Sequence, residues 1–452
     1  MSDLPDAETT AALTRGRVTY WRVSAIALPV VLSNATVPLQ GAIDIAIIGN
    51  LGDATLIAAV TLGAQAMTLM LAMFNFLQFG AGALSAQALG AGENRRVVNV
   101  LARALIIAAA IAALLIAAQA LLLPAIMAIF EASPEAERLA GIYFSIRIWA
   151  APAELGAYAV TGWFAGQEMT RRLFEVQVVT SLANVLFNLL FVFGFGMDVD
   201  GVALGTLIGV YIGLSWGLWR ARQRIADLMP GWRPERSRLL DPAELGRLMR
   251  LNRDIFIRTG MLVGSFTWFT RLGSLQGDVI LAANGILYQI FHIAVHGLDG
   301  FAMAAESLVG QAAGARDRHF LRRSVVVSTV SATGLAVAFA ALIFVLQQPL
   351  ISIFTNVPEV RAAADQFFFW AALLPLVGVA AYQLDGIFMG ATEGPAMRNA
   401  MIVSAAIYFA TSWWLAARFG NDGVWLGIWM FLLARAVTLG AQYPALERRA
   451  AA

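Results

Sequence analysis

Long apolar segments alternate with short polar segments along almost the whole chain of 452 residues. Each apolar segment has roughly 18 to 25 residues, which lets a helix cross about 30 Å of hydrocarbon. Because backbone hydrogen bonds must close inside each segment, the pattern predicts helices throughout and no β-barrel. We predict twelve transmembrane helices, near residues 21–47, 56–82, 98–123, 139–166, 173–196, 200–219, 251–273, 279–309, 323–346, 363–390, 398–416 and 422–441.

The polar segments predict how the helices are oriented. Loops after odd-numbered helices, such as GNLGDAT, carry few arginines, whereas loops after even-numbered helices, such as GENRR and GARDRHFLRR, carry many. Since basic residues stay on the cytoplasmic side, both termini are predicted to be cytoplasmic in a multi-pass protein of the inner (plasma) membrane. The first apolar segment is too long for a signal peptide, so we expect no cleaved targeting segment.

The longest polar stretch divides the chain nearly in half. Within it, Asp241 is a candidate helix N-cap, Pro242 suits the first helical position and Glu244 suits a capping box, which predicts an amphipathic helix. The predicted organisation is a cytoplasmic tail (1–20), a six-helix lobe (21–219), a cytoplasmic linker with that helix (220–250), a second six-helix lobe (251–441) and a second tail (442–452).

The two halves resemble each other. A shift of 224 positions places LSAQALGAGENRR over LVGQAAGARDRHF and GWFAGQ over GIFMGA, and a shift of 222 places VDGVALG over NDGVWLG. Each half has an even number of predicted helices, so the copies share one orientation and are related by a pseudo-two-fold axis along the membrane normal. This architecture is typical of alternating-access transporters.

Composition narrows the class further. The chain is 59% hydrophobic and 13% charged, with a net charge of +2 and a mean hydropathy of +0.72, values typical of an integral membrane protein. It has no cysteine, which excludes disulfides and thiolate chemistry. We find no phosphate-binding loop and no catalytic signature, so we predict neither an enzyme nor an ATP-driven pump. We expect no cofactor, metal or nucleic acid, and a monomer whose partners are small amphiphilic substrates and the lipid bilayer.

An acid interrupts the first predicted helix. Ser33, Val37, Gln40 and Asp44 share one helical face, and Pro38 frees a backbone carbonyl beside them. A carboxylate at a helix centre costs about 2.5 to 3.5 kcal/mol in a bilayer, so it needs a polar cavity, a partner or a proton. Because removal from water disfavours the charged form, Asp44 is predicted to undergo reversible protonation. Alternatively, it is buried only to bind another helix.

The eighth predicted helix carries a second polar stripe. It consists of His292, His296, Asp299, Met303 and Glu306, spaced four, three, four and three residues apart. The stripe either lines a secondary cavity or forms an interhelical polar network, and Asp385 on the tenth helix is predicted to face it. A metal site is disfavoured because no ligand-rich partner segment accompanies the two histidines.

The remaining intramembrane charges are predicted to be structural. Asp254 and Arg258 are four residues apart at the start of the seventh helix and are expected to form an ion pair. Arg147 and Glu154 on the fourth helix are two turns apart and are likewise expected to form structural ion pairs.

These segments together resemble the multidrug and toxic compound extrusion (MATE) transporters, and specifically their DinF (DNA-damage-inducible protein F) branch. The resemblance extends over about residues 20–440 and rests on LPVVLSNATVPLQGAIDIAIIGNLG, SAQALGAGE, LNRDIFIR, GLDGFAMAAESLVGQAAGARD and LPLVGVAAYQLDGIFMGATEGPAMRNA. It implies two six-helix lobes and antiport of amphiphilic, often cationic compounds against protons or sodium.

The resemblance also implies a set of site residues. The family's first-helix acid falls on Asp44, and Thr206 falls where a polar cavity residue is expected. In many relatives the fifth helix carries a second acid as N-x-x-x-D, but here the stretch is NVLFN, with Asn184 present and Asn188 in the acid's place. This departure weakens the case for a sodium site of two carboxylates.

The leading hypothesis is multidrug efflux, in which the chain exports amphiphilic, cationic organic compounds in exchange for protons. Asp44 would be the proton-coupling residue, with Gln40, Pro38, Asn184, Asn188 and Thr206 in the substrate cavity. Sodium-coupled drug efflux, efflux of organic anions such as citrate, and flipping of lipid-linked intermediates stay open as alternatives. A scaffold has little use for buried carboxylates, and a channel usually shows symmetric oligomeric pore motifs.

Overall fold

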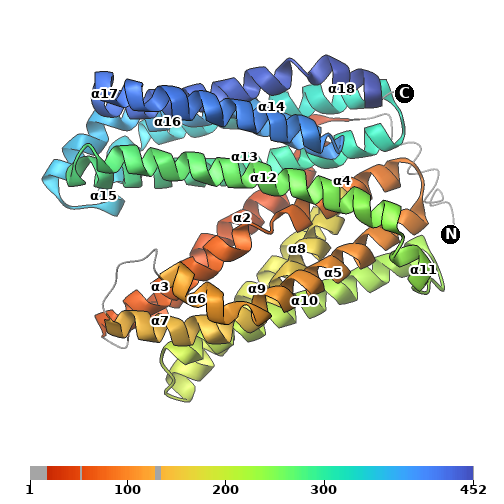
Figure 1. The fold of residues 1–452 in the computed structure, drawn as a ribbon, viewed down its shortest axis with the longest axis horizontal. Coiled ribbons are helices and arrows are strands. Elements are labelled where there is room, and N and C mark those ends of the chain that lie inside the picture. Colours follow the sequence, from red (N-terminus) through yellow and green to blue (C-terminus); the bar gives the residue numbers. More distant parts are fainter. Residues whose placement is uncertain (1–17, 51–52, 128–133, 451–452) are drawn as a thin grey trace. The chain divides into compact units, whose positions relative to one another are not determined.

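The computed structural model describes residues 18–50, 53–127 and 134–450, and at residues 37–39, 42, 54, 125–127, 236 and 238 it describes the backbone only. The regular secondary structure in these ranges is helical (Figure 1). The elements are α2 (Tyr20–Gly49), α3 (Ala54–Ala72), α4 (Phe76–Gly90), α5 (Asn94–Ala117), α6 (Gln119–Met127), α7 (Pro134–Arg147), the 3-10 helix η1 (Ile148–Ala150), α8 (Ala151–Gly166), α9 (Thr170–Leu189), the π-helix η2 (Leu190–Gly194), α10 (Val199–Leu228), α11 (Arg236–Leu239), α12 (Pro242–Ser274), α13 (Asp278–Gly314), α14 (Arg318–Val345), α15 (Gln347–Phe354), α16 (Pro358–Gly390), α17 (Gly394–Gly440) and α18 (Tyr443–Ala450).

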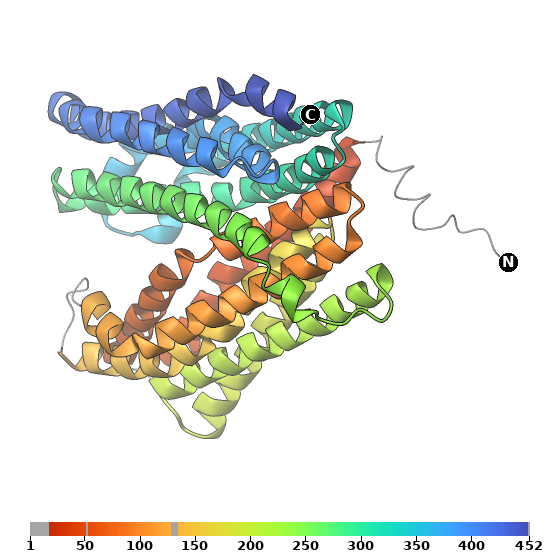
Figure 2. The ribbon, with the colours of Figure 1, turned by 45° about the vertical axis from the view of Figure 1, so that its right-hand side comes forward.

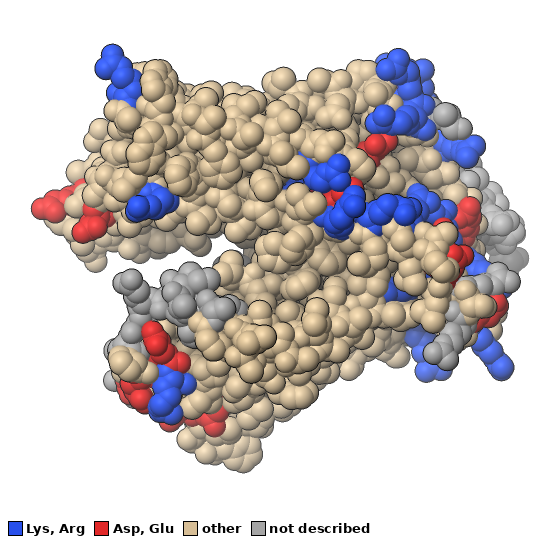
Figure 3. All heavy atoms as spheres, viewed as in Figure 1, with Lys and Arg blue, Asp and Glu red and all other residues tan. Residues whose placement is uncertain are grey.

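Many of these helices have the length and composition of membrane-spanning helices. Eight helical stretches of the described chain are long and apolar enough to cross a membrane: Thr55–Gly90, Asn94–Ala117, Thr170–Gly194, Val199–Leu228, Asp278–Gly314, Arg318–Val345, Pro358–Gly390 and Gly394–Ala450. On the face shown in Figure 3, charged side chains gather in a few groups, most of them toward the right-hand side, and large stretches between these groups carry none. The predicted all-helical, multi-span fold is therefore confirmed.

Several helix boundaries differ from those predicted. The second predicted helix is divided into α3 and α4 by a turn after Ala72. The linker helix and the seventh predicted helix form one continuous α12, because nothing in the sequence breaks a helix between them. The last two predicted helices share the label α17, but its backbone leaves helical geometry at Gly420 (φ 58°), a value that suits glycine, so the predicted break between 398–416 and 422–441 is present. Within the expected tail (442–452), the residues Tyr443–Ala450 form α18.

Contacts divide the chain into two compact units. Among the described residues, the amino-terminal unit lies within Leu32–Met249, and the carboxy-terminal unit consists of residues 18–31 and 250–450. In the amino-terminal unit, α9 packs along α10 and α4 packs along α8 (Figures 1 and 2). In the carboxy-terminal unit, α13 packs against both α14 and α16. The first turns of α2 therefore pack with helices from the end of the chain.

The internal repeat seen in the sequence reappears in the helix contacts. A Cβ atom added at Gly162 would lie 2.0 Å from the carbonyl oxygen of Gln78, so α8 touches the backbone of α4. A Cβ atom added at Gly386, 224 positions later, would lie 2.2 Å from the carbonyl oxygen of Ala302, so α16 touches the backbone of α13 in the same way. The two units thus contain equivalent helix crossings that only glycine permits.

Four helix ends repeat as well. Gly92 and Glu168 have positive φ values of 75° and 61°, and the residues 224 positions later, Arg316 and Thr392, have values of 54° and 56°. After each one, a backbone N–H bonds to a carbonyl five residues earlier, the 6→1 bond of a Schellman motif. Three of the four positions hold residues other than glycine, so tertiary packing enforces these turns at some cost in strain.

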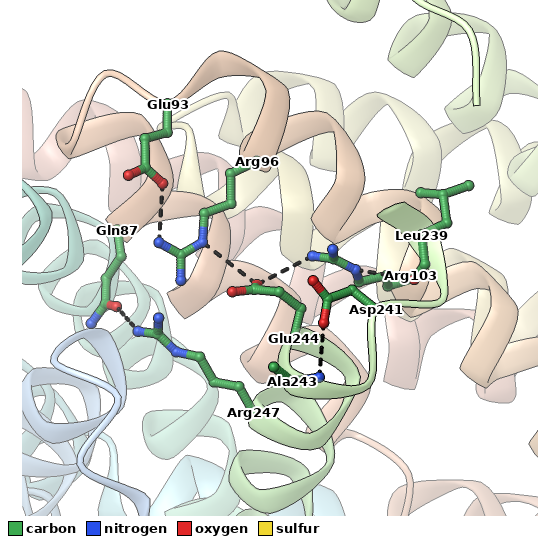
Figure 4. Close-up of polar contacts among 9 residues, drawn as sticks. All are labelled: Gln87, Glu93, Arg96, Arg103, Leu239, Asp241, Ala243, Glu244 and Arg247. Atoms are coloured by element: carbon green, nitrogen blue, oxygen red, sulfur yellow. Dashed lines mark hydrogen bonds and ion pairs between the residues drawn. The ribbon is translucent and has the colours of Figure 1, made fainter. Parts of the chain in front are cut away.

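The start of α12 is bound to the amino-terminal unit by a polar network (Figure 4). Asp241 Oδ1 accepts a hydrogen bond from the Ala243 N–H at 2.9 Å, as expected for an N-cap. The predicted capping box is wrong, because the Glu244 carboxylate binds Arg103 at 3.2 Å and Arg96 at 3.7 Å instead. Charge attraction to two arginines therefore takes Glu244 away from the helix end and fixes α12 against α5.

Candidate functional site

Asp44 lies in the second half of α2 and only 8% of its surface is exposed. Asn188 in α9 donates a hydrogen bond from Nδ2 to Asp44 Oδ1 at 2.6 Å. Asn188 is itself fully buried, so water does not compete for this bond. The carboxyl group is thus held by a neutral amide from a helix far away in the sequence.

A second polar contact lies one turn earlier on α9. Asn184 Nδ2 donates to Thr206 Oγ1 at 2.8 Å, and Thr206 Oγ1 donates to the carbonyl oxygen of Val202 at 2.8 Å. Asn184 and Thr206 are both buried. The three residues that the resemblance places on α9 and α10 therefore lie beside Asp44 in one buried polar group.

Small residues on α10 make this arrangement possible. A Cβ atom at Gly205 would lie 2.0 Å from Asn188 Oδ1, and one at Gly209 would lie 2.8 Å from the backbone nitrogen of Asn184. Any side chain at these two positions would push α10 away from α9. The glycine spacing therefore positions both asparagines, and it is a signal that the sequence reading did not use.

Gln40 joins the group from the next turn of α2. Ser181 in α9 donates a hydrogen bond to Gln40 Oε1 at 3.3 Å. Pro38 lies within α2, but its side chain is outside the described part of the structure. The structure thus brings Gln40, Asp44, Asn184, Asn188 and Thr206 to the interface of α2, α9 and α10.

Arg147 at the end of α7 lies near enough to Asp44 to act on its charge, although its direct partner is another residue. It is 7% exposed and forms a direct ion pair with Glu154 Oε1 at 2.6 Å. Within the described chain, Arg147 Nε and Nη1 are buried and have no hydrogen-bond partner. The sequence reading placed Arg147 in an ion pair but missed its influence on Asp44, because α2 and α7 are about one hundred residues apart.

The equivalent positions of the carboxy-terminal unit have different chemistry. Shifted by 224, Asp44 and Asn188 become Trp268 and Ser412, and Trp268 Nε1 donates to Ser412 Oγ at 2.9 Å. The helix pair and its polar contact are therefore repeated, but without an ionisable group. This difference makes the acid a special feature of the amino-terminal unit.

The polar stripe of α13 is partly assembled. His292 Nε2 lies 2.6 Å from the Tyr288 hydroxyl, and His296 Nδ1 lies 4.0 Å from Asp299 Oδ2. Both the His296 and the Asp299 side chains are about half exposed, whereas Glu306 is 4% exposed. Within the described residues, no group of three or more His, Cys, Asp and Glu side chains could hold a metal ion.

Asp385 on α16 is held by two arginines. Its Oδ2 atom accepts hydrogen bonds from Arg258 Nη2 on α12 and from Arg435 Nη2 on α17. Arg435 was missed by the sequence reading, although a lone arginine in the apolar stretch FLLARAVTL is as unusual as Asp44.

The predicted pair of Asp254 and Arg258 is replaced by other partners. Asp254 Oδ1 accepts from Arg398 Nη1 at 2.8 Å and lies 3.1 Å from Arg253 Nη2. Arg258 is one turn further along α12 and binds Asp385 instead. Helix spacing alone therefore gave the wrong partner, because arginines and acids from α16 and α17 reach both residues.

The fold and the buried polar residues define a multi-pass helical membrane protein with a carboxyl group inside a helix bundle. A structure described as the outward-facing conformation of a multidrug resistance MATE family transporter of the MOP superfamily has the same fold, with a TM-score of 0.84 at 17% sequence identity, covering 96% of this chain and 98% of that chain.

Sequence comparisons agree with the fold. The family model described as MatE matches residues 29–190 and 257–414. DNA damage-inducible protein F of Escherichia coli is 32% identical over 95% of this chain and 93% of that protein. A probable multidrug resistance protein NorM of Bradyrhizobium diazoefficiens is 28% identical over 94% and 93% of the two chains. The chain therefore belongs to the MatE family of transporters, and it is not an enzyme.

Proposed function

We propose that this transporter exports amphiphilic, cationic organic compounds in exchange for protons, with Asp44 as the residue that binds the proton. The observation that carries the proposal is the buried contact between Asp44 and Asn188. Arg147 forms its direct ion pair with Glu154, so the group bonded to Asp44 is the neutral Asn188 amide, which stabilises an ionised carboxylate less than a bonded cation does. The negative charge therefore invites either a proton or a cationic substrate. Competition between these two ligands for Asp44 couples their movements in opposite directions.

The neighbouring polar groups are proposed to line the substrate cavity. Gln40, Asn184, Asn188 and Thr206 supply hydrogen-bonding groups on the helices around Asp44. Pro38 is proposed to loosen α2 beside them, so that protonation of Asp44 reshapes the helix. Apolar substrate surface would then contact the residues between these polar groups.

The arrangement in the membrane is part of the same proposal. We propose twelve crossings in two six-helix lobes related by a pseudo-two-fold axis along the membrane normal, in the inner membrane with both termini cytoplasmic. The repeated helix crossings at Gly162 and Gly386 support the two-lobe arrangement. Alternating access between the lobes would expose Asp44 first to one side and then to the other.

Sodium is the second candidate for the coupling ion. Asn184 Oδ1 and Asn188 Oδ1 are buried and have no hydrogen-bond partner in the described chain. Together with the Asp44 carboxylate they are the kind of oxygen ligands that a hard cation takes. The single carboxylate supports the proton, and the two unpaired oxygens support sodium.

The test is efflux of ethidium, an amphiphilic cation, from proteoliposomes with an imposed proton gradient or sodium gradient. We expect the proton gradient to drive efflux by the wild type and the Asp44→Asn variant to lose this coupled efflux. Asp227→Asn, an exposed position at the end of α10, is the matched control and should transport normally. Normal proton-driven efflux by Asp44→Asn contradicts the role of Asp44, and efflux driven by sodium alone contradicts the choice of ion.

A further inference from the structure

The carboxy-terminal unit holds two arginines around one buried acid. Arg258 and Arg435 reach the same oxygen of Asp385 from α12 and α17. Asp385 and Arg435 are 6% and 1% exposed, and the Arg258 side chain is 12% exposed. One carboxylate therefore faces two guanidinium groups in a place that excludes most water.

The two guanidinium groups have hydrogen-bond donors that no described residue accepts. Arg258 Nε, Arg435 Nε and Arg435 Nη1 are buried without a hydrogen-bond partner among the described residues. The rings of Tyr382 and Phe431 lie 5.7 and 5.5 Å from the Arg435 guanidinium carbon, so they desolvate it without accepting these bonds. Buried donors without an acceptor are costly, which indicates that an acceptor from outside the chain completes the group.

Asp299 is a second acid near this cluster, and its side chain is much more exposed than that of Asp385. Its side chain is 47% exposed, and it lies near Arg258, Asp385 and Arg435, close enough for their charges to act on it. It lies one turn before Ala302, where α13 meets α16 beside Asp385. With both acids ionised the cluster is neutral, whereas with Asp299 neutral it carries one excess positive charge.

The titratable and charged groups near Asp299 come from four helices. His296 lies on its own helix at 4.0 Å, Arg258 comes from α12 and Arg435 comes from α17. Asp385 and the Tyr382 hydroxyl come from α16. Helix α14 also packs against α13, but it has no charged residue between 324 and 345. The balance between these two acids and two arginines therefore decides the local charge.

We propose that Arg258 and Arg435 form a binding site for an oxyanion group, a carboxylate or a phosphate monoester, of an amphiphilic molecule, and that Asp299 competes with this group for the two arginines. The unsatisfied guanidinium donors bind the anion, and Asp385 keeps both arginines oriented. Asp299 opposes the anion until it takes up a proton. Anion binding is thus accompanied by proton uptake at a place separate from Asp44.

A purely structural role explains the cluster less well. Shifted by 224, Arg258 and Asp385 become Asn34 and Thr161, and shifted by 222, Arg435 becomes Gly213. The corresponding helices of the amino-terminal unit therefore pack without charges at these positions. A simple ion pair between helices would also need one arginine for Asp385 rather than two.

The test is equilibrium dialysis of radiolabelled benzoate and phenyl phosphate against the purified full-length protein in maltoside detergent without phosphate. We expect the wild type to bind both anions, more tightly as the pH is lowered, and not to bind neutral benzamide. Arg258→Gln should weaken binding about tenfold to a hundredfold, the usual effect of losing a charged hydrogen-bond donor. Arg253→Gln, an exposed arginine on the same helix, should bind like the wild type.

Two acid variants distinguish this site from a structural ion pair. Asp299→Asn should bind the anions tightly at every pH, because the competing charge is gone. Asp385→Asn keeps an oxygen that can accept from the arginines but loses the negative charge, so it should also bind the anions more tightly than the wild type, whereas a structural role predicts only a lower unfolding temperature. Native mass spectrometry separates the sources of the anion: a retained phospholipid that Arg258→Gln loses indicates a lipid headgroup, and a lipid-free protein that binds benzoate indicates a soluble anion.

Either source supports the site. The proposal is overturned if Arg258→Gln and Arg435→Gln, both shown to be folded by thermal unfolding, bind the anions and lipid as the wild type does. It is also overturned if Asp299→Asn binds neither anion and retains no lipid. Neither result depends on ethidium efflux, so this site can fail while the role of Asp44 stands.

Discussion

Replacing Asn188 with leucine removes the hydrogen bond to Asp44 while keeping a side chain of similar size. The bond measures 2.6 Å and both partners are buried, so no water replaces the lost donor. A hydrogen bond to a charged group contributes about 1.5 to 3 kcal/mol. Because one pH unit corresponds to about 1.4 kcal/mol, the loss amounts to about one to two pH units.

The direction of the change follows from the donor. The Asn188 amide stabilises the ionised carboxylate, so without it Asp44 binds its proton at a higher pH. The midpoint of the pH dependence of ethidium efflux should therefore rise by about one to two units in Asn188→Leu. The assay is initial efflux rate in proteoliposomes over a series of internal and external pH values.

Ser412→Ala is the matched control for this variant. It removes the hydrogen bond between Trp268 and Ser412 at the equivalent position of the other unit, where no carboxyl group is present. Its midpoint should equal that of the wild type. An unchanged midpoint in folded Asn188→Leu would refute the reasoning, as would equal shifts in both variants.

Two further predictions concern stability. Gly386→Ala should lower the free energy of unfolding by about 1 to 3 kcal/mol, because its Cβ would meet the Ala302 carbonyl oxygen. Gly334→Ala, with open space around it, should not lower this free energy. Denaturation in mixed micelles measures both variants, and equal stabilities would contradict the close crossing. Glu244→Gln should speed amide hydrogen exchange in the first turns of α12 about tenfold, because it breaks the ion pair with the buried Arg103. Glu235→Gln, in a half-exposed pair with Arg95, should leave exchange unchanged. Slow exchange in Glu244→Gln would show that the network does not hold α12.

The sequence predicts the helices well because hydropathy depends only on local composition. It predicts less about where helices end: the Schellman turns at Arg316 and Thr392 use residues that have no preference for positive φ. The glycines at positions 162 and 386 could be aligned as a repeat, but their role as contact points appears only when the neighbouring helices are in place.

The candidate site shows the same limit. Asp44 is evident from the sequence because a carboxylate is costly in a membrane, and Asn188 was singled out because it replaces an acid. These two residues are 144 positions apart in the sequence, so the hydrogen bond between them depends on how α2 and α9 pack together. Arg258 was assigned to Asp254 by helical spacing, whereas the tertiary fold provides Asp385. Local spacing thus identifies residues more reliably than their partners.

The central claim is that Asp44 gives up a proton when substrate binds. The direct measurement is proton release into weakly buffered detergent solution, followed with a pH indicator, as ethidium is added to the purified protein. The wild type should release up to one proton for each ethidium bound, and Asp44→Asn should bind ethidium more weakly and release no proton with the ethidium that it does bind. Equal proton release from the two proteins would contradict the account.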